Sequence, residues 1–159
     1  MKLVLTRVQN ARVEIGGQVA GSIGTGFLIL LGVEMTDTEN DAAYCADRVC
    51  GLRVFEDDEG KMNRSPSDAG AEFLVISQFT LCADISKRRP GFTAAARPEQ
   101  AIPLYERFMA LCRQQGFSVQ SGVFGADMQV FSQNDGPVTI LVDSSVPRPK
   151  PSKGGRMVC

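Results

Sequence analysis

The strongest constraint on the fold of this chain is an almost uninterrupted apolar run at Phe27–Val33, with a second one at Phe73–Leu81. Runs of this length without polar alternation are typical of strands that are covered on both faces. We therefore expect a sheet whose central strands are buried beneath other elements.

Shorter patterns predict more strands on either side of these runs. The first 15 residues alternate apolar and polar side chains, and Gly16-Gly17 predicts a hairpin turn into a strand at 18–23. Three segments near the C-terminus have the composition of the last strands: 119–124, 128–131 and 138–142.

Two segments predict the main helices. Asp37 or Thr38 can cap a helix that ends near Leu52. Pro98 suits the first position of a second helix, which we expect to end at Gly116 and to bend at Pro103. The fold class predicted from pattern is α+β, with mostly antiparallel strands and two helices.

The chain length of 159 residues fits one domain. After Asp143 the composition shifts to Pro, Lys and Gly, which predicts a flexible tail at 144–159 behind a domain at 1–143. The N-terminal apolar run is interrupted by polar residues, and Phe27–Leu31 is too short to span a bilayer. We expect a cytoplasmic protein without a membrane segment.

Composition excludes several chemistries. The chain has no His, which removes Ser-His-Asp and Cys-His sites and the usual metal ligand. Its 5 Cys form no CxxC pair, as expected of reduced thiols, and no GxGxxG motif supports a dinucleotide. The carboxylates of Asp57, Asp58 and Glu59 lie in a turn ended by Gly60 and are expected to be solvated. We expect no metal and no cofactor.

Two motifs carry a resemblance. Ser77-Gln78-Phe79-Thr80-Leu81 and Asn134-Asp135-Gly136-Pro137-Val138-Thr139 resemble the SQFTL and NxGPVT signatures of D-aminoacyl-tRNA deacylases. Supporting matches occur in the same order along the chain: Arg7-Val8, Gly60-Lys61-Met62-Asn63 and Ala126-Asp127-Met128-Gln129-Val130. The resemblance covers about residues 1–142. It implies a homodimeric, barrel-like hydrolase that frees D-amino acids, and by extension glycine, from the 3′ end of tRNA.

The resemblance implies a catalytic segment at Ser77, Gln78, Phe79 and Thr80. Where a strand opens into a loop, the N–H groups of Phe79 and Thr80 can stabilise an oxyanion. The Thr80 hydroxyl is a candidate nucleophile, but the chain has no His to activate it. Alternatively, Thr80 is an ordinary β-branched strand residue. Family members are thought to rely on the 2′-hydroxyl of the terminal adenosine instead.

The second motif is implied to recognise chirality. In the family a Gly-cisPro element projects into the active site of the dimer partner, which here corresponds to Gly136-Pro137, flanked by Asn134 and Val138. From sequence alone, a trans turn at an edge strand is the default. The resemblance also implies that Arg7 fixes this loop across the dimer, a role that suits a guanidinium.

The adenosine pocket is implied to involve Phe124 and Met128, which by composition alone are ordinary core residues. A basic segment, Lys87-Arg88-Arg89, either contacts acceptor-stem phosphates or is a solvated loop. The net charge of −1 and pI of about 5.5 disfavour binding along an extended nucleic-acid backbone, but they allow binding to one end of an RNA.

Two other functions stay open at this point. One is a nucleic-acid-binding module of the same fold, in which the segment after Asp143 would contribute. The other is a hydrolase of small esters that depends on a carboxylate or thiol, with Cys82 as the candidate thiol because it follows the first motif.

Overall fold

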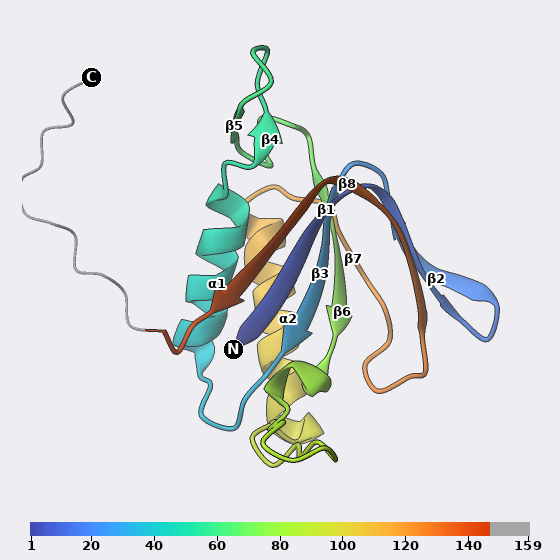
Figure 1. The fold of residues 1–159 in the computed structure, drawn as a ribbon, viewed down its shortest axis with the longest axis vertical. Coiled ribbons are helices and arrows are strands. Elements are labelled where there is room, and N and C mark those ends of the chain that lie inside the picture. The colour runs from blue at the N-terminus through green and yellow to red at the C-terminus, as the bar shows by residue number, and fades with distance from the viewer. Residues whose placement is uncertain (147–159) are drawn as a thin grey trace, which may run out of the picture.

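The computed structural model describes residues 1–146. One sheet dominates the fold, and two helices, α1 (Glu39–Gly51) and α2 (Pro98–Gln114), lie side by side along it (Figure 1). A small hairpin of β4 (Phe55–Glu56) and β5 (Met62–Arg64) stands apart. The large sheet contains β1 (Lys2–Ile15), β2 (Gln18–Ile23), β3 (Gly26–Gly32), β6 (Glu72–Ser77), β7 (Val119–Ser121) and β8 (Gln129–Asp143).

The strand order is β2-β1-β3-β6-β7, and β8 pairs with the other edge of β1. β1 is antiparallel to β2, β3 and β8, whereas β3–β6 and β6–β7 are parallel. The ends of this order approach each other, since a Cβ on Gly21 of β2 would lie 2.8 Å from the Ser121 carbonyl oxygen of β7. The nearly closed sheet confirms the predicted α+β, barrel-like class.

Local sequence signals correctly predicted a hairpin turn, a helix cap and a helix start. Gly16 and Gly17 have φ values of 56° and 79°, as a two-residue hairpin turn between β1 and β2 requires. Thr38 is the N-cap of α1, and its backbone N–H donates to the Asp41 carboxylate at 2.8 Å. α2 begins at Pro98 as predicted, and it continues through Pro103.

Three predictions of strand boundaries were wrong. The strand expected at 119–124 ends at Ser121 as β7. The strand expected at Phe73–Leu81 ends at Ser77, and Phe79–Cys82 forms a 3₁₀ turn, η1. The strands expected at 128–131 and 138–142 are one strand, β8, because residues 132–134 also pair with β1 and the pairing resumes at Thr139 after a bulge.

The buried side chains form two clusters on opposite faces of the sheet. The cluster beneath the helices includes Leu3, Leu5, Phe27, Ile29 and Phe73. The other, inside the curl of the sheet, includes Val8, Val13, Leu28, Leu74 and Ile76. Alternate residues of β3 and β6 therefore enter different clusters, which explains why both strands are apolar throughout.

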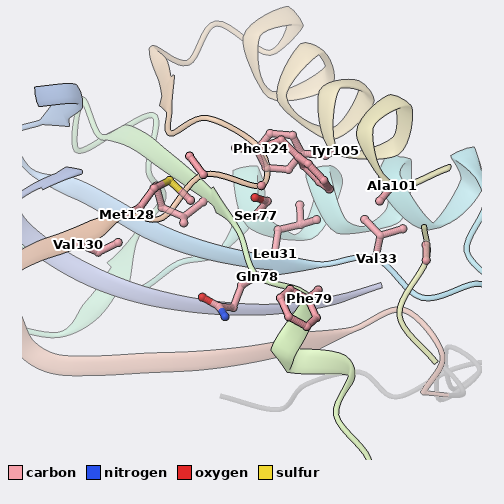
Figure 2. Close-up of a pocket in the computed structure, with 14 residues that line it drawn as sticks. Leu31, Val33, Ser77, Gln78, Phe79, Ala101, Tyr105, Phe124, Met128 and Val130 are labelled. Atoms are coloured by element: carbon pink, nitrogen blue, oxygen red, sulfur yellow. The ribbon is translucent and has the colours of Figure 1, made fainter. Parts of the chain in front are cut away.

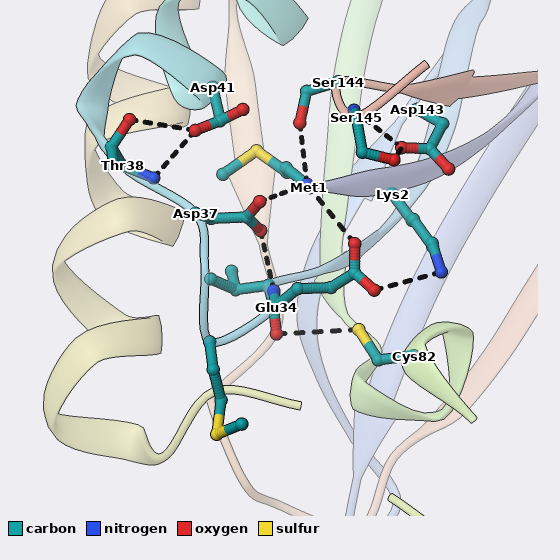
Figure 3. A network of polar contacts seen from close by, with 12 residues as sticks. Met1, Lys2, Glu34, Asp37, Thr38, Asp41, Cys82, Asp143, Ser144 and Ser145 are labelled. Carbon is teal, nitrogen blue, oxygen red and sulfur yellow. Dashed lines mark hydrogen bonds and ion pairs between the residues drawn. The ribbon is translucent and has the colours of Figure 1, made fainter. Parts of the chain in front are cut away.

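The amino group of Met1 is buried in a polar cluster (Figure 3). It donates to Asp37 Oδ1 and, at 2.8 Å, to Ser144 Oγ, and it lies 3.9 Å from Glu34 Oε2. Asp37 Oδ2 accepts from the Glu34 N–H at 2.7 Å. This cluster joins the start of β1, the connection into α1 and the end of β8.

The predicted tail falls largely outside the described residues, which end at 146. Within residues 1–146, no helix is long and apolar enough to cross a membrane.

Candidate active site

A cavity of about 240 Å³ opens at the carboxyl ends of β3 and β6. Its walls also include residues of α2 and of the segment that joins β7 to β8 (Figure 2). The lining residues are Leu31, Val33, Ile76, Ser77, Gln78, Phe79, Ala96, Ala101, Tyr105, Phe124, Gly125, Ala126, Met128 and Val130. Five of the residues proposed from sequence therefore meet here: Ser77, Gln78, Phe79, Phe124 and Met128.

The first motif forms one rim of the cavity. The Gln78 N–H donates to the Leu31 carbonyl at 2.8 Å, which fixes the exit from β6. Phe79 and Thr80 follow as the first residues of η1, and the first N–H groups of a helical turn have no acceptor within that turn. These amides are therefore suited to bind an external oxygen atom.

Thr80 lies beside the cavity rather than in its wall. Its Oγ1 accepts a hydrogen bond from Gln78 Nε2. Since an amide nitrogen cannot take up a proton from the hydroxyl, this contact does not activate Thr80 as a nucleophile.

The far wall contains a residue that the sequence reasoning missed. Tyr105 donates from its hydroxyl to the Val75 carbonyl at 2.7 Å, and its ring centroid lies 6.0 Å from that of Phe124. Burial raises the pKa of Tyr105 to about 12, so the phenol stays neutral near pH 7. Its position on the apolar stripe of α2 offered no signal that distinguishes a cavity wall from core.

Met128 is held against the sheet by a close approach. A Cβ on Gly122 would lie 2.4 Å from Met128 Sδ, so a side chain at this position would displace Met128 from its place against the sheet. Val130, another residue that sequence reasoning missed, follows on β8 and is 40% exposed.

The second motif forms a bulge in β8. Thr6 of β1 pairs with Thr139 and Val8 pairs with Asn134, so Arg7 alone lies opposite residues 135–138. The Gly136–Pro137 peptide bond is cis, as the resemblance implied, and Gly136 has a φ of 115°. None of Asn134, Gly136, Pro137 and Val138 lines the cavity of the same chain.

Arg7 anchors this bulge from within the same chain. Its side chain is 3% exposed, Nη1 donates to the Val54 carbonyl, and Nη2 lies 3.7 Å from Glu56 Oε1. Nε lies 3.0 Å from Asp135 Oδ2, an ion pair that lacks the angle of a hydrogen bond. A Cβ on Gly136 would lie 3.1 Å from Arg7 Nη2, so the guanidinium lies directly against the motif.

Cys82 is not placed to act as a nucleophile in the cavity. Cys82 is 3% exposed, its Sγ donates to the Val33 carbonyl at 3.5 Å, and it does not line the cavity. Burial raises the pKa of the Cys82 thiol, which keeps it protonated and weakly nucleophilic near pH 7.

The carboxylate turn is structural as well. The Asp57 carboxylate accepts from the N–H groups of Glu59 and Lys61, both at 3.0 Å, and these bonds lower its pKa. No group of three or more potential metal ligands occurs within residues 1–146.

Comparisons with known proteins find relatives that match most of the chain. A family model described as D-Tyr-tRNA(Tyr) deacylase matches residues 4–143. A D-aminoacyl-tRNA deacylase of Thermus aquaticus is 54% identical over 146 residues, 91% of this chain and 96% of that protein. The protein of the same name from Symbiobacterium thermophilum is 55% identical over 145 residues, with the same coverage.

Two solved structures share the fold. One described as "c-Myc DNA Unwinding Element Binding Protein" has a TM-score of 0.87 and 39% identity, covering 92% of this chain and all of that one. A second, described as "Structural Analysis of a probable eukaryotic D-amino acid tRNA deacylase", has a TM-score of 0.75 over 89% of this chain and 97% of its own. Its 15% identity makes this a likeness of fold alone.

Proposed function

The chain belongs to the D-Tyr-tRNA(Tyr) deacylase family, and from that premise we propose where its substrate binds and how it distinguishes D- from L-amino acids. Its relatives are D-aminoacyl-tRNA deacylases, and the activity of this chain is hydrolysis of the ester that joins a D-amino acid to tRNA. The products are the free D-amino acid and tRNA.

The cavity of Figure 2 binds the terminal adenosine and the ester. Phe124 and Met128 provide an apolar wall for the adenine, since aromatic and apolar side chains bind the faces of bases. The ester carbonyl then points to the N–H groups of Phe79 and Thr80, which stabilise the oxyanion. A donor of this kind typically contributes about 10²–10³ in rate.

Water is activated by the substrate rather than by a side chain. The chain has no His, the Thr80 hydroxyl accepts from Gln78, and Cys82 is buried. In the 3′-ester of aminoacyl-tRNA, the 2′-hydroxyl of the terminal ribose lies next to the ester group. It therefore supplies the oxygen that assists the attack of water.

A second copy of the chain supplies the chirality filter. The observation that carries this proposal is the division of the motif residues: one motif forms the cavity rim, whereas Gly136-Pro137 lies outside that cavity. In a homodimer the bulge of one subunit enters the cavity of the other, and its carbonyl groups bind the α-amino group of the substrate. An L side chain would collide with this backbone, whereas glycine has no side chain and is accepted.

The face for a second copy is the side of the sheet that the helices do not cover. Register places Leu141, Val4, Leu30 and Ile76 in one row across β8, β1, β3 and β6. Ile76 lies in the cavity wall, and Leu141 at the outer end of the row is 76% exposed. Apolar surface that is continuous with a ligand site is typical of an interaction surface.

Subunit complementation tests this arrangement. Met128→Trp blocks the cavity and Gly136→Ala disturbs the bulge, so each homodimer is inactive. After refolding an equal mixture, half of the dimers are mixed, and each holds one intact site, which predicts about one quarter of wild-type activity. Restoration to that level requires a shared site, whereas an inactive mixture shows that each subunit works alone.

Selectivity is measured on the same preparation with D-Tyr-tRNA, L-Tyr-tRNA and Gly-tRNA. We expect release of D-tyrosine and glycine and negligible release of L-tyrosine. Equal hydrolysis of both tyrosyl esters contradicts the filter while leaving the ester chemistry intact.

A further inference from the structure

A run of exposed cations lies between the first motif and Phe92, whose ring contacts a residue of the cavity wall. Lys87, Arg88 and Arg89 are all exposed, and none of them forms an ion pair with another residue of the described chain. They lie in a loop at 84–91, which we call the basic loop. A chain with a net charge of −1 thus concentrates positive charge at one place.

The basic loop has a defined base. Asp84 and Gly91 exchange two backbone hydrogen bonds of 2.8 and 2.9 Å, which close the loop. The carboxylate of Asp84 accepts from the Ser86 N–H at 2.9 Å, and this bond lowers its pKa. The one carboxylate of the basic loop is therefore engaged with the backbone of its own turn instead of pairing with the three cations.

An aromatic pair connects the basic loop to the cavity. Phe92 follows the loop directly, and its ring meets that of Phe79 edge to face, with centroids 5.0 Å apart. Phe79 belongs to the cavity wall, yet it is 56% exposed, and Phe92 is 37% exposed. Two exposed aromatic rings between a cavity and a group of cations provide apolar faces beside a source of positive charge.

We propose that Phe92 and the basic loop bind the unpaired nucleotides that precede the terminal adenosine of the tRNA. This inference rests on the proposed function, which places the adenosine in the cavity. One base stacks on the exposed face of Phe92, and three phosphates of the same strand lie against the three cations. Aromatic stacking platforms with adjacent cations are how proteins bind single-stranded nucleic acid without reading its sequence.

A single-stranded end fits this surface better than a duplex. A duplex backbone presents phosphates to a long basic stripe, whereas the basic loop offers three cations in a row. Bases that are paired in a duplex cannot stack on Phe92. Stacking on a ring next to the cavity requires a strand that is already unpaired, as the 3′ end of tRNA is.

The test compares two substrates and three variants. The variants are Lys87→Ala/Arg88→Ala/Arg89→Ala, Phe92→Leu, and the matched control Arg48→Ala/Lys61→Ala/Arg107→Ala. The control removes three exposed cations elsewhere and changes the net charge equally. The substrates are D-Tyr-tRNA and D-tyrosyl-adenosine. The second contains the part that is proposed to bind in the cavity and lacks the preceding nucleotides.

We expect the triple basic-loop variant to lose at least about tenfold in kcat/KM on D-Tyr-tRNA and to keep wild-type kcat/KM on D-tyrosyl-adenosine. The dependence of log kcat/KM on log salt should become shallower by about 2, for three phosphate contacts with single-stranded RNA. Phe92→Leu should lose about tenfold on D-Tyr-tRNA with an unchanged salt slope. The control variant should match wild type on both substrates.

Three results of these rate measurements would overturn the proposal. They are an equal loss on both substrates, a loss in the control as large as in the basic-loop variant, or no loss on D-Tyr-tRNA.

Binding of uncharged tRNA separates this question from that of the cavity. Wild type should bind intact tRNA more tightly than tRNA trimmed of its unpaired 3′ nucleotides, and the basic-loop variant should not discriminate. If duplex DNA competes as well as intact tRNA, the surface binds duplexes and the proposal is wrong. Failure of wild type to hydrolyse D-tyrosyl-adenosine would refute the cavity assignment instead.

Discussion

Thr80 offers a direct test of the reaction mechanism at the scale of one residue. Its hydroxyl accepts from Gln78 Nε2, and within residues 1–146 it has no hydrogen bond to a basic group. We expect Thr80→Ala to stay within about tenfold of wild type in single-turnover hydrolysis of D-Tyr-tRNA, whereas removal of a true nucleophile costs about 10⁴-fold or more. Thr80→Ser serves as the control, because it keeps the hydroxyl. Abolished hydrolysis in Thr80→Ala with intact tRNA binding would assign the chemistry to this side chain.

Gly136 is constrained by both its backbone and its surroundings. Its φ of 115° is disfavoured for L residues, and a Cβ would lie 2.8 Å from Val138 Cγ2. We expect Gly136→Ala to reduce deacylation more than tenfold, because the bulge must move away from Arg7 to admit the methyl group. Gly60→Ala is the matched control: Gly60 also has a positive φ, of 74°, but a Cβ there meets nothing within 4 Å.

Thermal unfolding of the two glycine variants separates strain from function. Both should lose about 1–3 kcal/mol of stability from backbone conformation. Only Gly136→Ala should lose activity. Equal activity losses would mean that backbone strain in general, and not the contact with Arg7, impairs the enzyme.

The rim of the candidate site could be found from sequence, whereas its far wall could not. Ser77, Gln78 and Phe79 belong to a motif whose polar members lie at the end of an apolar strand. Tyr105 lies on the apolar stripe of α2, where its spacing is that of any core residue. Only the three-dimensional structure shows that its ring borders a cavity.

At the scale of elements, sequence patterns gave wrong strand boundaries at the two motifs. Phe79 extends the apolar run of β6, yet it belongs to η1 and is 56% exposed. Gly136-Pro137 reads as the end of a strand, because both residues are rare inside sheets. The bulge opposite Arg7 accommodates them while β8 continues on both sides.

The polar cluster at Met1 predicts a stability effect at the junction of three elements. Asp37 is 7% exposed and binds both the Met1 amino group and the Glu34 N–H. Asp37→Asn removes the charge opposite a buried ammonium group, so we expect a loss of about 3–5 kcal/mol in the free energy of unfolding.

Chemical denaturation measures this loss, with Glu39→Gln as the control. The Glu39 side chain is 77% exposed, and its ion pair with Arg107 spans 3.7 Å, so this variant should stay within about 0.5 kcal/mol of wild type. A comparable loss in both variants would show that the Asp37 cluster has no special role.

At the scale of the whole molecule, the two parallel strand pairs were not predictable from local patterns. β3 reaches β6 through α1, and β6 reaches β7 through α2. A crossover helix permits parallel pairing but does not reveal which strands become neighbours. The antiparallel hairpin of β1 and β2 was predictable, because two glycines define its turn.

Leu141 tests the proposed assembly. Because its side chain is 76% exposed in one chain, Leu141→Glu should leave the stability of the monomer unchanged. At a dimer interface it would bury a carboxylate, so we expect a monomer by light scattering and loss of deacylation. Val19→Glu, at an exposed position on β2, is the control. A Leu141→Glu protein with the mass and activity of wild type would place the interface elsewhere.

The bulge in β8 also restricts how the chain can vary in length. Side chains along a strand alternate between the faces of the sheet, so a single insertion or deletion reverses every position beyond it. The four residues at 135–138 opposite Arg7 set the phase that turns Val130 toward the cavity while Leu141 extends the row across the sheet. A shift by one residue in the pairing of 129–134 with β1 would turn Val130 away from the cavity and bring its neighbour to that face. The bulge must therefore end where the pairing with β1 resumes, which constrains this segment as much as the identity of the glycine and the proline does.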